Sequence, residues 1–477
     1  MSKFCPVYPK PAKSRASLLW MFFRKRHSWL SGLFERSYHM KMGHVHLPGL
    51  DLYMINEPSL VRKVLIEQAE RFPKHALLDR ILKPLLGSSI FTTNGETWQR
   101  QRSMMDEGFE HARLKTVFPL MNAAAQAMLD RLDTVADGRD YDIDIEMTHV
   151  TADIIFRTIM SVPLEGEDAK KIFEAFLRFQ EMAPRIALPI MYKLPRWMTP
   201  WLDSMKSRKA AEEIRSLLAT FIRPRFDAHR SGIPSEDQDI LAALLDAKDK
   251  NDGTGFSFEE LLDQIAMLFL AGHETSASAL AWAHYLMTMS PEVQERMHEE
   301  VVAVAGEREL MFTDIKKLEL VGNVMKETLR LYPPVGFFAR EATEATLMRN
   351  KKIKPGASIM ISPWLTHRHR KLWERPDEFD PDRYQTDASR ESLRCAYMPF
   401  GQGPRVCIGA AFAMQEAVLI LAQLVRRYRF TTIPGYQPEP VGRLTIRSDN
   451  GICLRIERRQ IVPSQNAASS LSTAFQT

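Results

Sequence analysis

The most informative segment of this 477-residue chain is Phe400-Gly401-Gln402-Gly403-Pro404-Arg405-Val406-Cys407-Ile408-Gly409. Its glycines allow positive φ angles and a close approach of the backbone to a flat ligand. A helical pattern follows over 410–424, so Cys407 is predicted at a helix start, where backbone N–H groups and the helix dipole lower a thiol pKa. Arg405 is placed to pair with an acidic group on whatever the thiolate binds.

The composition is that of a folded, soluble-type protein, with 45% hydrophobic and 26% charged residues. The length allows two to four ordinary domains or one unusually large fold. A net charge of +5 is too small to make nucleic acid the default partner. The four cysteines are widely spaced and lack a CxxC pair, which argues against a disulfide scaffold or structural zinc and favours a reduced, intracellular location.

Hydrophobic periodicity is helical from about residue 58 to about 330, and strands are predicted only as fragments. The predicted helices cover 121–132, 150–160, 165–180 and 205–229, and the predicted strands cover 45–47, 51–55, 353–361 and 444–456. No repeat or Pro/Gly/Ser linker divides the chain. We therefore expect a single mainly α domain over 41–460 with a small discontinuous β part, an N-terminal segment over 1–40 and a disordered tail over 461–477.

The N-terminal segment is predicted to contain an amphipathic helix over 17–37. Its apolar run at 18–23 is far shorter than the roughly 20 residues that a membrane span needs. Docking on the body of the protein is favoured over lying on a membrane surface. The residues available for burial are Leu19, Phe22, Phe23, Trp29, Leu30 and Leu33.

A long helix is predicted between a capping box, Ser257 with Glu260, and the break at Ser290-Pro291. Its middle, 265–271, is apolar all round and should be buried. Inside it lies Ala271-Gly272-His273-Glu274-Thr275-Ser276. Polar groups in a buried helix are costly unless they are hydrogen-bonded or serve a purpose.

These motifs resemble those of the cytochrome P450 family. The segment 400–409 matches its haem-binding loop, F-G-x-G-x-R-x-C-x-G, and 271–276 matches A-G-x-[DE]-T-[ST]. Glu327 and Arg330 match E-x-x-R, and 379–384 resembles the segment that supplies a third ion-pair member, here Arg383. The resemblance implies the P450 fold, with haem b between the long central helix and the cysteine loop.

The resemblance also implies roles for individual residues. Cys407 would be the axial iron ligand, Glu274 and Thr275 would deliver protons, and Gly272 would leave room for dioxygen. Glu327, Arg330 and Arg383 would form a buried structural triad, although spacing alone favours a solvated surface pair of Glu327 and Arg330. The other implied haem-binding residues are Trp98, Arg102, Ala271, Arg340, Phe400, Gly401, Arg405 and Gly409.

The same resemblance outlines an apolar substrate pocket with a lid over 173–201. The expected wall residues are Leu77, Leu78, Ile81, Leu82, Leu85, Leu86, Phe269, Leu270, Ala271, Val335 to Phe338, and Leu444 to Ile446. His273 is expected to face away from the haem. His367 and His369 are expected in a loop at the haem edge or in solvent rather than in a second metal site.

The implied function is a monooxygenase that inserts one oxygen atom from O2 into a C–H or C=C bond of a hydrophobic small molecule. A peroxide-driven or rearranging haem-thiolate enzyme is the alternative, although such relatives often lose the acid–alcohol pair; a non-catalytic haem-binding protein is a third. No nicotinamide or flavin fingerprint is present, so electrons from NAD(P)H are expected through a ferredoxin and its reductase, or through a flavoprotein reductase. We expect a soluble, cytoplasmic, bacterial-type monomer without a transmembrane span, with weak membrane-surface association left open.

Overall fold

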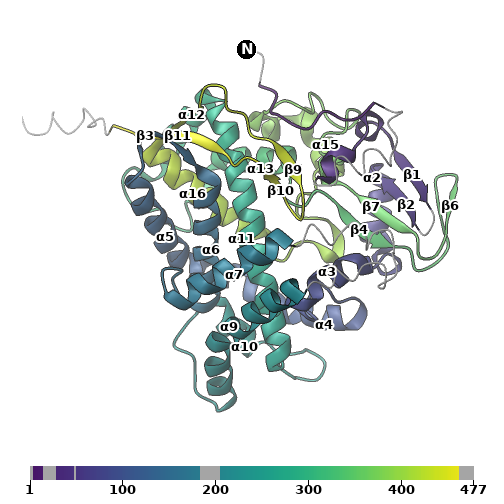
Figure 1. The fold of residues 1–477 in the computed structure, drawn as a ribbon, viewed down its shortest axis with the longest axis horizontal. Coiled ribbons are helices and arrows are strands. Elements are labelled where there is room, and N and C mark those ends of the chain that lie inside the picture. The colour runs from purple at the N-terminus through teal and green to yellow at the C-terminus, as the bar shows by residue number, and fades with distance from the viewer. Residues whose placement is uncertain (1–3, 14–27, 48–49, 183–204, 461–477) are drawn as a thin grey trace, which may run out of the picture.

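A computed structural model of the chain describes residues 4–13, 28–47, 50–182 and 205–460. Most helices gather on one side of the molecule, and a four-stranded sheet lies on the other (Figure 1). Helix α11, Phe258–Thr288, runs through the middle. The arrangement is mainly α with small separate sheets, as the sequence predicts.

The helices include those predicted over 121–132, 150–160, 165–180 and 205–229. Their bounds are α2 Pro58–Arg62, α3 Ala76–Leu86, α4 Gly95–Asp106, α5 His111–Asp133, α6 Ile143–Met160, α7 Glu167–Met182, α9 Met205–Arg230, α10 Ile240–Asp246, α11 Phe258–Thr288, α12 Pro291–Ala305, α13 Glu319–Leu331, α14 Pro363–Thr366, α15 Asp387–Ala396 and α16 Ala410–Arg427.

The strands form four small sheets with the orders β1-β2-β7-β4, β3-β11-β8, β9-β10 and β5-β6. In the first, β2 pairs parallel with β7, and the other two pairs are antiparallel. The antiparallel pair of β1 and β2 confirms the strands predicted over 45–47 and 51–55. The bounds are β1 Met42–Leu47, β2 Leu50–Ile55, β3 Asp137–Asp142, β4 Phe338–Glu341, β5 Thr346–Met348, β6 Lys351–Ile353, β7 Ser358–Ile361, β8 Tyr428–Thr431, β9 Pro440–Gly442, β10 Ile446–Ser448 and β11 Cys453–Arg458.

Helix α11 begins at the predicted capping box. The Ser257 Oγ accepts the Glu260 N–H at 3.3 Å, and the Glu260 carboxylate accepts the Ser257 N–H at 2.9 Å. From Leu261 to Thr288 every residue is buried except Ala271, Gly272 and Thr275. Because these three lie one and four positions apart, they share one face of the helix.

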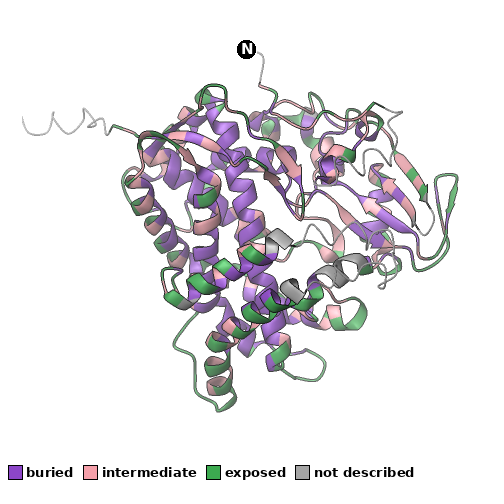
Figure 2. Cartoon of the chain, viewed as in Figure 1, coloured by how far each residue is buried: buried purple, intermediate pink, exposed green. Residues whose placement is uncertain are grey.

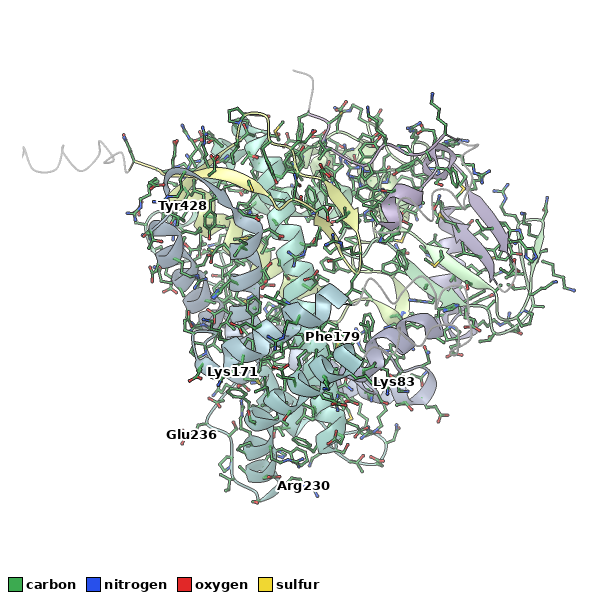
Figure 3. The ribbon with its side chains drawn as sticks, in the orientation of Figure 1. Lys83, Lys171, Phe179, Arg230, Glu236 and Tyr428 are labelled. Carbon is green, nitrogen blue, oxygen red and sulfur yellow. The ribbon has the colours of Figure 1, made fainter. Side chains whose placement is uncertain are left out.

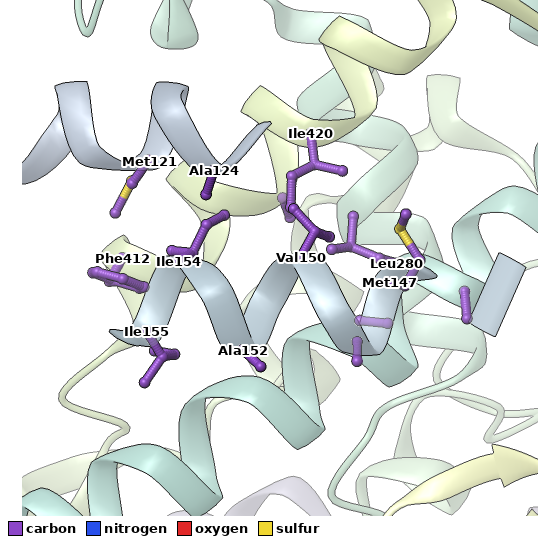
Figure 4. Packing of buried hydrophobic residues seen from close by; sticks show 14 of the residues in the cluster. Met121, Ala124, Met147, Val150, Ala152, Ile154, Ile155, Leu280, Phe412 and Ile420 are labelled. Atoms are coloured by element: carbon purple, nitrogen blue, oxygen red, sulfur yellow. The ribbon is translucent and has the colours of Figure 1, made fainter. Parts of the chain in front are cut away.

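The main core lies between α5, α6, α11 and α16, whose facing sides are buried (Figure 2). Figure 4 shows side chains of α5, α6, α11 and α16 meeting there, including Met121, Ile154, Leu280 and Ile420. Tyr428 ties the start of β8 to α5, since its hydroxyl donates to the Asp133 carboxylate at 2.7 Å (Figure 3). These contacts hold α11 in a fixed position against its neighbours.

The predicted N-terminal helix is wrong over 28–37, while 17–27 lie outside the described residues. Two short 3₁₀ turns, Trp29–Gly32 and Glu35–Tyr38, replace it. The helix is interrupted because Phe34 pairs with Ala12 in a parallel bridge. Leu30 and Leu33 are buried against the body of the protein, as expected. None of the described helices is long and apolar enough to cross a bilayer.

Candidate active site

The cysteine loop is held in shape by its own backbone. The Cys407 N–H donates to the Phe400 carbonyl at 2.9 Å, and Gly401 and Gly403 adopt φ angles of 77° and 73°. At Gly403 a side chain would also collide with the Leu65 carbonyl. Glycine is therefore required at this position by both conformation and space.

Cys407 carries a free, exposed thiol just before α16. Desolvation by neighbouring protein raises the pKa of this thiol above its usual value, although the Gly409 N–H, Arg102 and Lys74 act to lower it. The sequence-based expectation of a lowered pKa is therefore wrong for the protein alone. Since a metal ion deprotonates a thiol that coordinates it, thiolate formation at Cys407 would depend on metal binding.

Four cations gather beside this loop. Burial and the nearby Arg340 and Arg102 lower the pKa of Arg405 to about 9, and burial lowers that of Arg340 to about 10. The pKa of Lys74 is well below its usual value, mainly because the side chain is buried and also because Arg405 and Arg340 are close to it. Among the described residues, no carboxylate pairs with Arg340 or Arg405. Such an uncompensated positive cluster favours binding of an acidic group.

Helix α4 joins this cluster to the loop. Arg102 donates to the Val406 carbonyl at 2.8 Å and pairs with Asp106 at 2.8 Å. The Arg405 guanidinium lies 3.8 Å from the centre of the Trp98 ring and donates to the Thr93 carbonyl. The structure thus brings Trp98, Arg102, Arg340 and Arg405 together around Cys407. A thiol and adjacent cations fit a flat iron-containing group that carries acid substituents.

Glu327 lies buried between Arg330 and Arg383. Its carboxylate accepts from Arg330 at 2.8 and 2.9 Å and from the Arg383 Nε at 3.0 Å. Arg330 also donates to the His367 carbonyl at 2.9 Å. Although burial acts to raise the pKa of Glu327, the two guanidinium groups hold it below its usual value. This geometry excludes the alternative of a solvent-exposed pair.

His367 connects the triad to the cysteine loop. Its Nε2 accepts the Met398 N–H at 2.9 Å, two residues before Phe400. Both His367 and His369 are buried, so the expected alternative of a position in solvent is wrong, whereas a position at the haem edge stays a prediction. The reason is that the His367 ring is used as a backbone acceptor. Because Nε2 accepts, His367 is neutral, and burial lowers its pKa to about 3.

The partly exposed strip of α11 contains the predicted hydroxyl. Thr275 donates to the Ala271 carbonyl at 2.7 Å, so its oxygen lone pairs remain available to accept a proton or hydrogen bond. One residue further on, Ser276 donates to Glu416 of α16 at 2.8 Å. This bond ties the turn that carries Thr275 to the helix that follows Cys407.

Glu274 is held in an ion-pair network. Arg447 of β10 donates to it at 2.7 Å, and the Thr445 hydroxyl donates at 2.5 Å. Arg447 also reaches Asp144 of α6 at 2.6 Å. Burial acts to raise the pKa of Glu274, but Arg447 brings it below its usual value. Glu274 is therefore an ionised acceptor whose link toward the surface is Arg447.

Gly272 has a packing role that the sequence does not reveal. A Cβ built on it would lie 2.5 Å from the Cδ1 of Ile155 on α6. The missing side chain therefore makes room for α6. The expected room for dioxygen at Gly272 stays a prediction. His273 lies near the aromatic side chains Phe173 and Phe176 of α7.

The expected pocket residues divide into two groups. Val335, Phe337 and Leu444 are half-buried, whereas Leu82, Leu270 and Phe269 are buried. Phe269 packs against Phe156 in the core between helices, with the ring centroids 4.5 Å apart. The lid predicted over 173–201 begins within α7, where Phe173, Phe176 and Phe179 pack in or against the main core. Its remainder, 183–201, and the side chains of residues 77–81 lie outside the described residues.

Several contributors are absent from the sequence-based site. Arg447 contacts Glu274 from more than 170 positions away in the chain, and Asp144 joins it from α6. Thr445, expected only as a pocket wall residue, donates its hydroxyl to Glu274. Lys74 joins the cation cluster through a bridge between its backbone and that of Arg340. None of them belongs to a local motif, so only tertiary pairing could have identified them.

A family model described as Cytochrome P450 matches residues 9–459. The chain therefore belongs to the cytochrome P450 family and is a P450 monooxygenase, whose cofactor is haem b. It is 31% identical to Cyclooctatin synthase of Streptomyces melanosporofaciens, with 82% of this chain and 83% of that protein covered. It is also 31% identical to Cyclooctat-9-en-7-ol 5-monooxygenase of the same organism, with coverage of 80% and 81%. The crystal structure of the cytochrome P450DA heme domain has the same fold, with a TM-score of 0.77 at 24% identity and coverage of 88% of this chain and 90% of that one.

Proposed function

We propose that this enzyme inserts one oxygen atom from O2 into a C–H or C=C bond of a hydrophobic small molecule. The observation that carries the proposal is the free Cys407 thiol beside the uncompensated cations Lys74, Arg340 and Arg405. Bound haem supplies the oxygen chemistry, in which NAD(P)H is oxidised and the second oxygen atom leaves as water. Cys407 would hold the iron, and the cations would bind the propionates with Arg102 and Trp98.

The distal side of the site would be organised by α11. Thr275 provides a hydroxyl oxygen on the exposed strip, and Glu274 provides an ionised carboxylate on the same turn. Arg447 and Asp144 would orient Glu274 and link it toward solvent, because the side chains of both are partly exposed. Because the guanidinium of Arg447 keeps its proton, Arg447 would hold Glu274 in place as an ionised acceptor, and water would carry protons from outside to Glu274 and Thr275.

The proposed substrate is a hydrocarbon-rich molecule. One similar protein is named for oxidation of cyclooctat-9-en-7-ol. The half-buried Val335, Phe337 and Leu444 would provide apolar contacts. A panel of carbocyclic alkenols, screened for the high-spin shift of the haem Soret band, tests this class. A shift produced only by polar or charged ligands would contradict it.

Cys407→Ser is the direct test of the haem-thiolate site. A serine hydroxyl is not readily deprotonated, so the variant should lose the long-wavelength Soret band of the reduced carbon monoxide complex. Cys395→Ser and Cys453→Ser are matched controls that should keep it. If a control variant lost the band and Cys407→Ser kept it, the ligand assignment would be wrong.

Electrons would come from a separate acidic ferredoxin that docks near the cysteine loop. The sequence-based docking face comprises Arg102, Arg394, Arg405, Arg426, Arg427 and Arg429. Arg394, Arg427 and Arg429 have carboxylate partners, which reduces the net charge of this face. Turnover at limiting ferredoxin should still fall as ionic strength rises from about 0.05 to 0.5 M, because salt screens steering. An unchanged rate with intact fold would exclude this docking mode.

A further inference from the structure

Three metal-binding side chains meet on the β1–β2 hairpin, away from the cysteine loop. His44 and His46 are two residues apart on β1, so they project from the same face of the strand. Asp51 of β2 lies directly opposite His46 in the antiparallel register. The Asp51 Oδ1 is 2.6 Å from the His44 Nε2 and 3.4 Å from the His46 Nδ1. The candidate ligand atoms all lie within 4.8 Å of one another.

The hairpin orients this group before any ligand arrives. The His44 ring stacks on Tyr53, the residue opposite it, with centroids 4.2 Å apart and planes 3° apart. Burial acts to raise the pKa of Asp51, but the two histidines hold it below its usual value, so this carboxylate is ionised at neutral pH. The His46 side chain is 75% exposed, which leaves one side of the group open to water. Within the described part of the chain, β1 is also the edge strand of its sheet.

We propose that His44, His46 and Asp51 bind a divalent transition-metal ion, with Zn²⁺ as the best match. Two imidazole nitrogens and one carboxylate oxygen suit Zn²⁺, whereas Mg²⁺ and Ca²⁺ prefer oxygen ligands alone. Zinc bonds of about 2.0–2.1 Å in a tetrahedron place neighbouring ligand atoms about 3.3 Å apart. The His46–Asp51 separation of 3.4 Å already fits. The 2.6 Å separation of His44 and Asp51 must increase by about 0.7 Å when the proton between them is displaced, and water completes the tetrahedron.

The site would act as a cross-strand clip. A bound ion would join β1 to β2 by bonds from side chains on both strands. Metal binding at this site needs neither haem nor substrate, so it can be tested independently of the monooxygenase reaction.

The test is competition for Zn²⁺ between the haem-loaded, tag-free protein and a chromophoric chelator. The wild type should hold one Zn²⁺ per chain at this site, and millimolar Mg²⁺ should not displace it. His46→Gln and Asp51→Asn should each weaken that binding by at least about tenfold. Both side chains are partly or largely exposed, and an unchanged Soret band and circular dichroism spectrum would show that the variants are folded.

His229→Gln is the matched control. His229 forms a surface pair with Asp246 at 2.9 Å. Neither residue belongs to the cluster of His44, His46 and Asp51 found among the described residues. Zinc affinity should be unchanged in this variant. Equal affinity in wild type, His46→Gln and Asp51→Asn would overturn the proposal, and so would an equal loss in His229→Gln, which would indicate generic surface binding.

Discussion

At the scale of single residues, the proposed oxygen chemistry depends on two neighbours in α11 with different partners. Thr275 donates to a carbonyl of its own helix, whereas Glu274 points to Arg447 and Thr445 outside it. The Thr275 hydroxyl therefore lies on the partly exposed strip of α11, whereas the buried Glu274 carboxylate faces Arg447. Loss of one side chain should have a different consequence from loss of the other.

Thr275→Ala should uncouple NAD(P)H oxidation from product formation. Alanine is a good helix former and Thr275 is not an iron ligand, so haem binding should persist. Without the hydroxyl, proton delivery is misdirected and reducing equivalents leave as hydrogen peroxide. Product per NAD(P)H should drop several-fold with little change in KM, since the lost interaction belongs to the transition state.

Thr275→Ser is the control for this measurement, because it keeps the hydroxyl and should keep most of the coupling. Full coupling in Thr275→Ala would show that Ser276 or water carries the protons.

At the scale of elements, α11 and α6 approach closely because position 272 has no side chain. Alanine is normally about 1 kcal/mol better than glycine inside a helix. Here its Cβ would meet Ile155, which is buried in the core of Figure 4, at 2.5 Å. Overpacking of this kind costs about 1–3 kcal/mol, which exceeds the helical gain.

Gly272→Ala should therefore lower the free energy of unfolding by up to about 2 kcal/mol. Ile155→Val removes the Cδ1 that causes the clash, so the penalty of Gly272→Ala should shrink in that background. Denaturant unfolding of the four proteins in a double-mutant cycle measures this coupling. If Gly272→Ala cost the same free energy with and without Ile155→Val, contact with Ile155 would not be the cause of the destabilisation.

The sequence predicts α11 well because both ends carry local signals, Ser257 with Glu260 and Pro291. It does not predict β3, Asp137–Asp142, because this polar strand has no alternating apolar residues and forms only by pairing with β11. The same division holds at the site. Cys407 belongs to a local motif, whereas Arg447 acquires its partners Glu274 and Asp144 only when the chain folds.

At the scale of the whole molecule, buried ionisable groups make stability depend on pH in two opposing ways. His284 and His367 are neutral in the fold, and burial lowers their pKa values to about 4 and about 3. The unfolded chain takes up protons at both below about pH 6.5, so stability falls as the solution becomes more acidic. Glu416 behaves oppositely, because burial raises its pKa to about 8 and the folded state holds the extra proton.

The sign for Glu416 follows from linkage. Its contribution to stability is fully present below its unfolded pKa near 4.3 and is lost as pH rises through about 8. His284 and His367 make stability rise with pH, but only below about pH 6.5, where the unfolded chain binds protons at both. With these three groups, stability should be greatest near pH 6.5 and should decline toward pH 8, where Glu416 alone among them acts.

Glu416→Gln tests this directly, because glutamine has nearly the shape of the protonated acid and still accepts from Ser276. The thermal midpoint of the haem-loaded wild type should fall between about pH 6.5 and 8, whereas that of Glu416→Gln should stay level over this interval. Below pH 6.5 the variant should lose stability more steeply than the wild type, since the opposing contribution of Glu416 is gone. Parallel profiles at all pH values would mean that Glu416 is ionised in the folded protein, with Ser276 and unseen water compensating its charge.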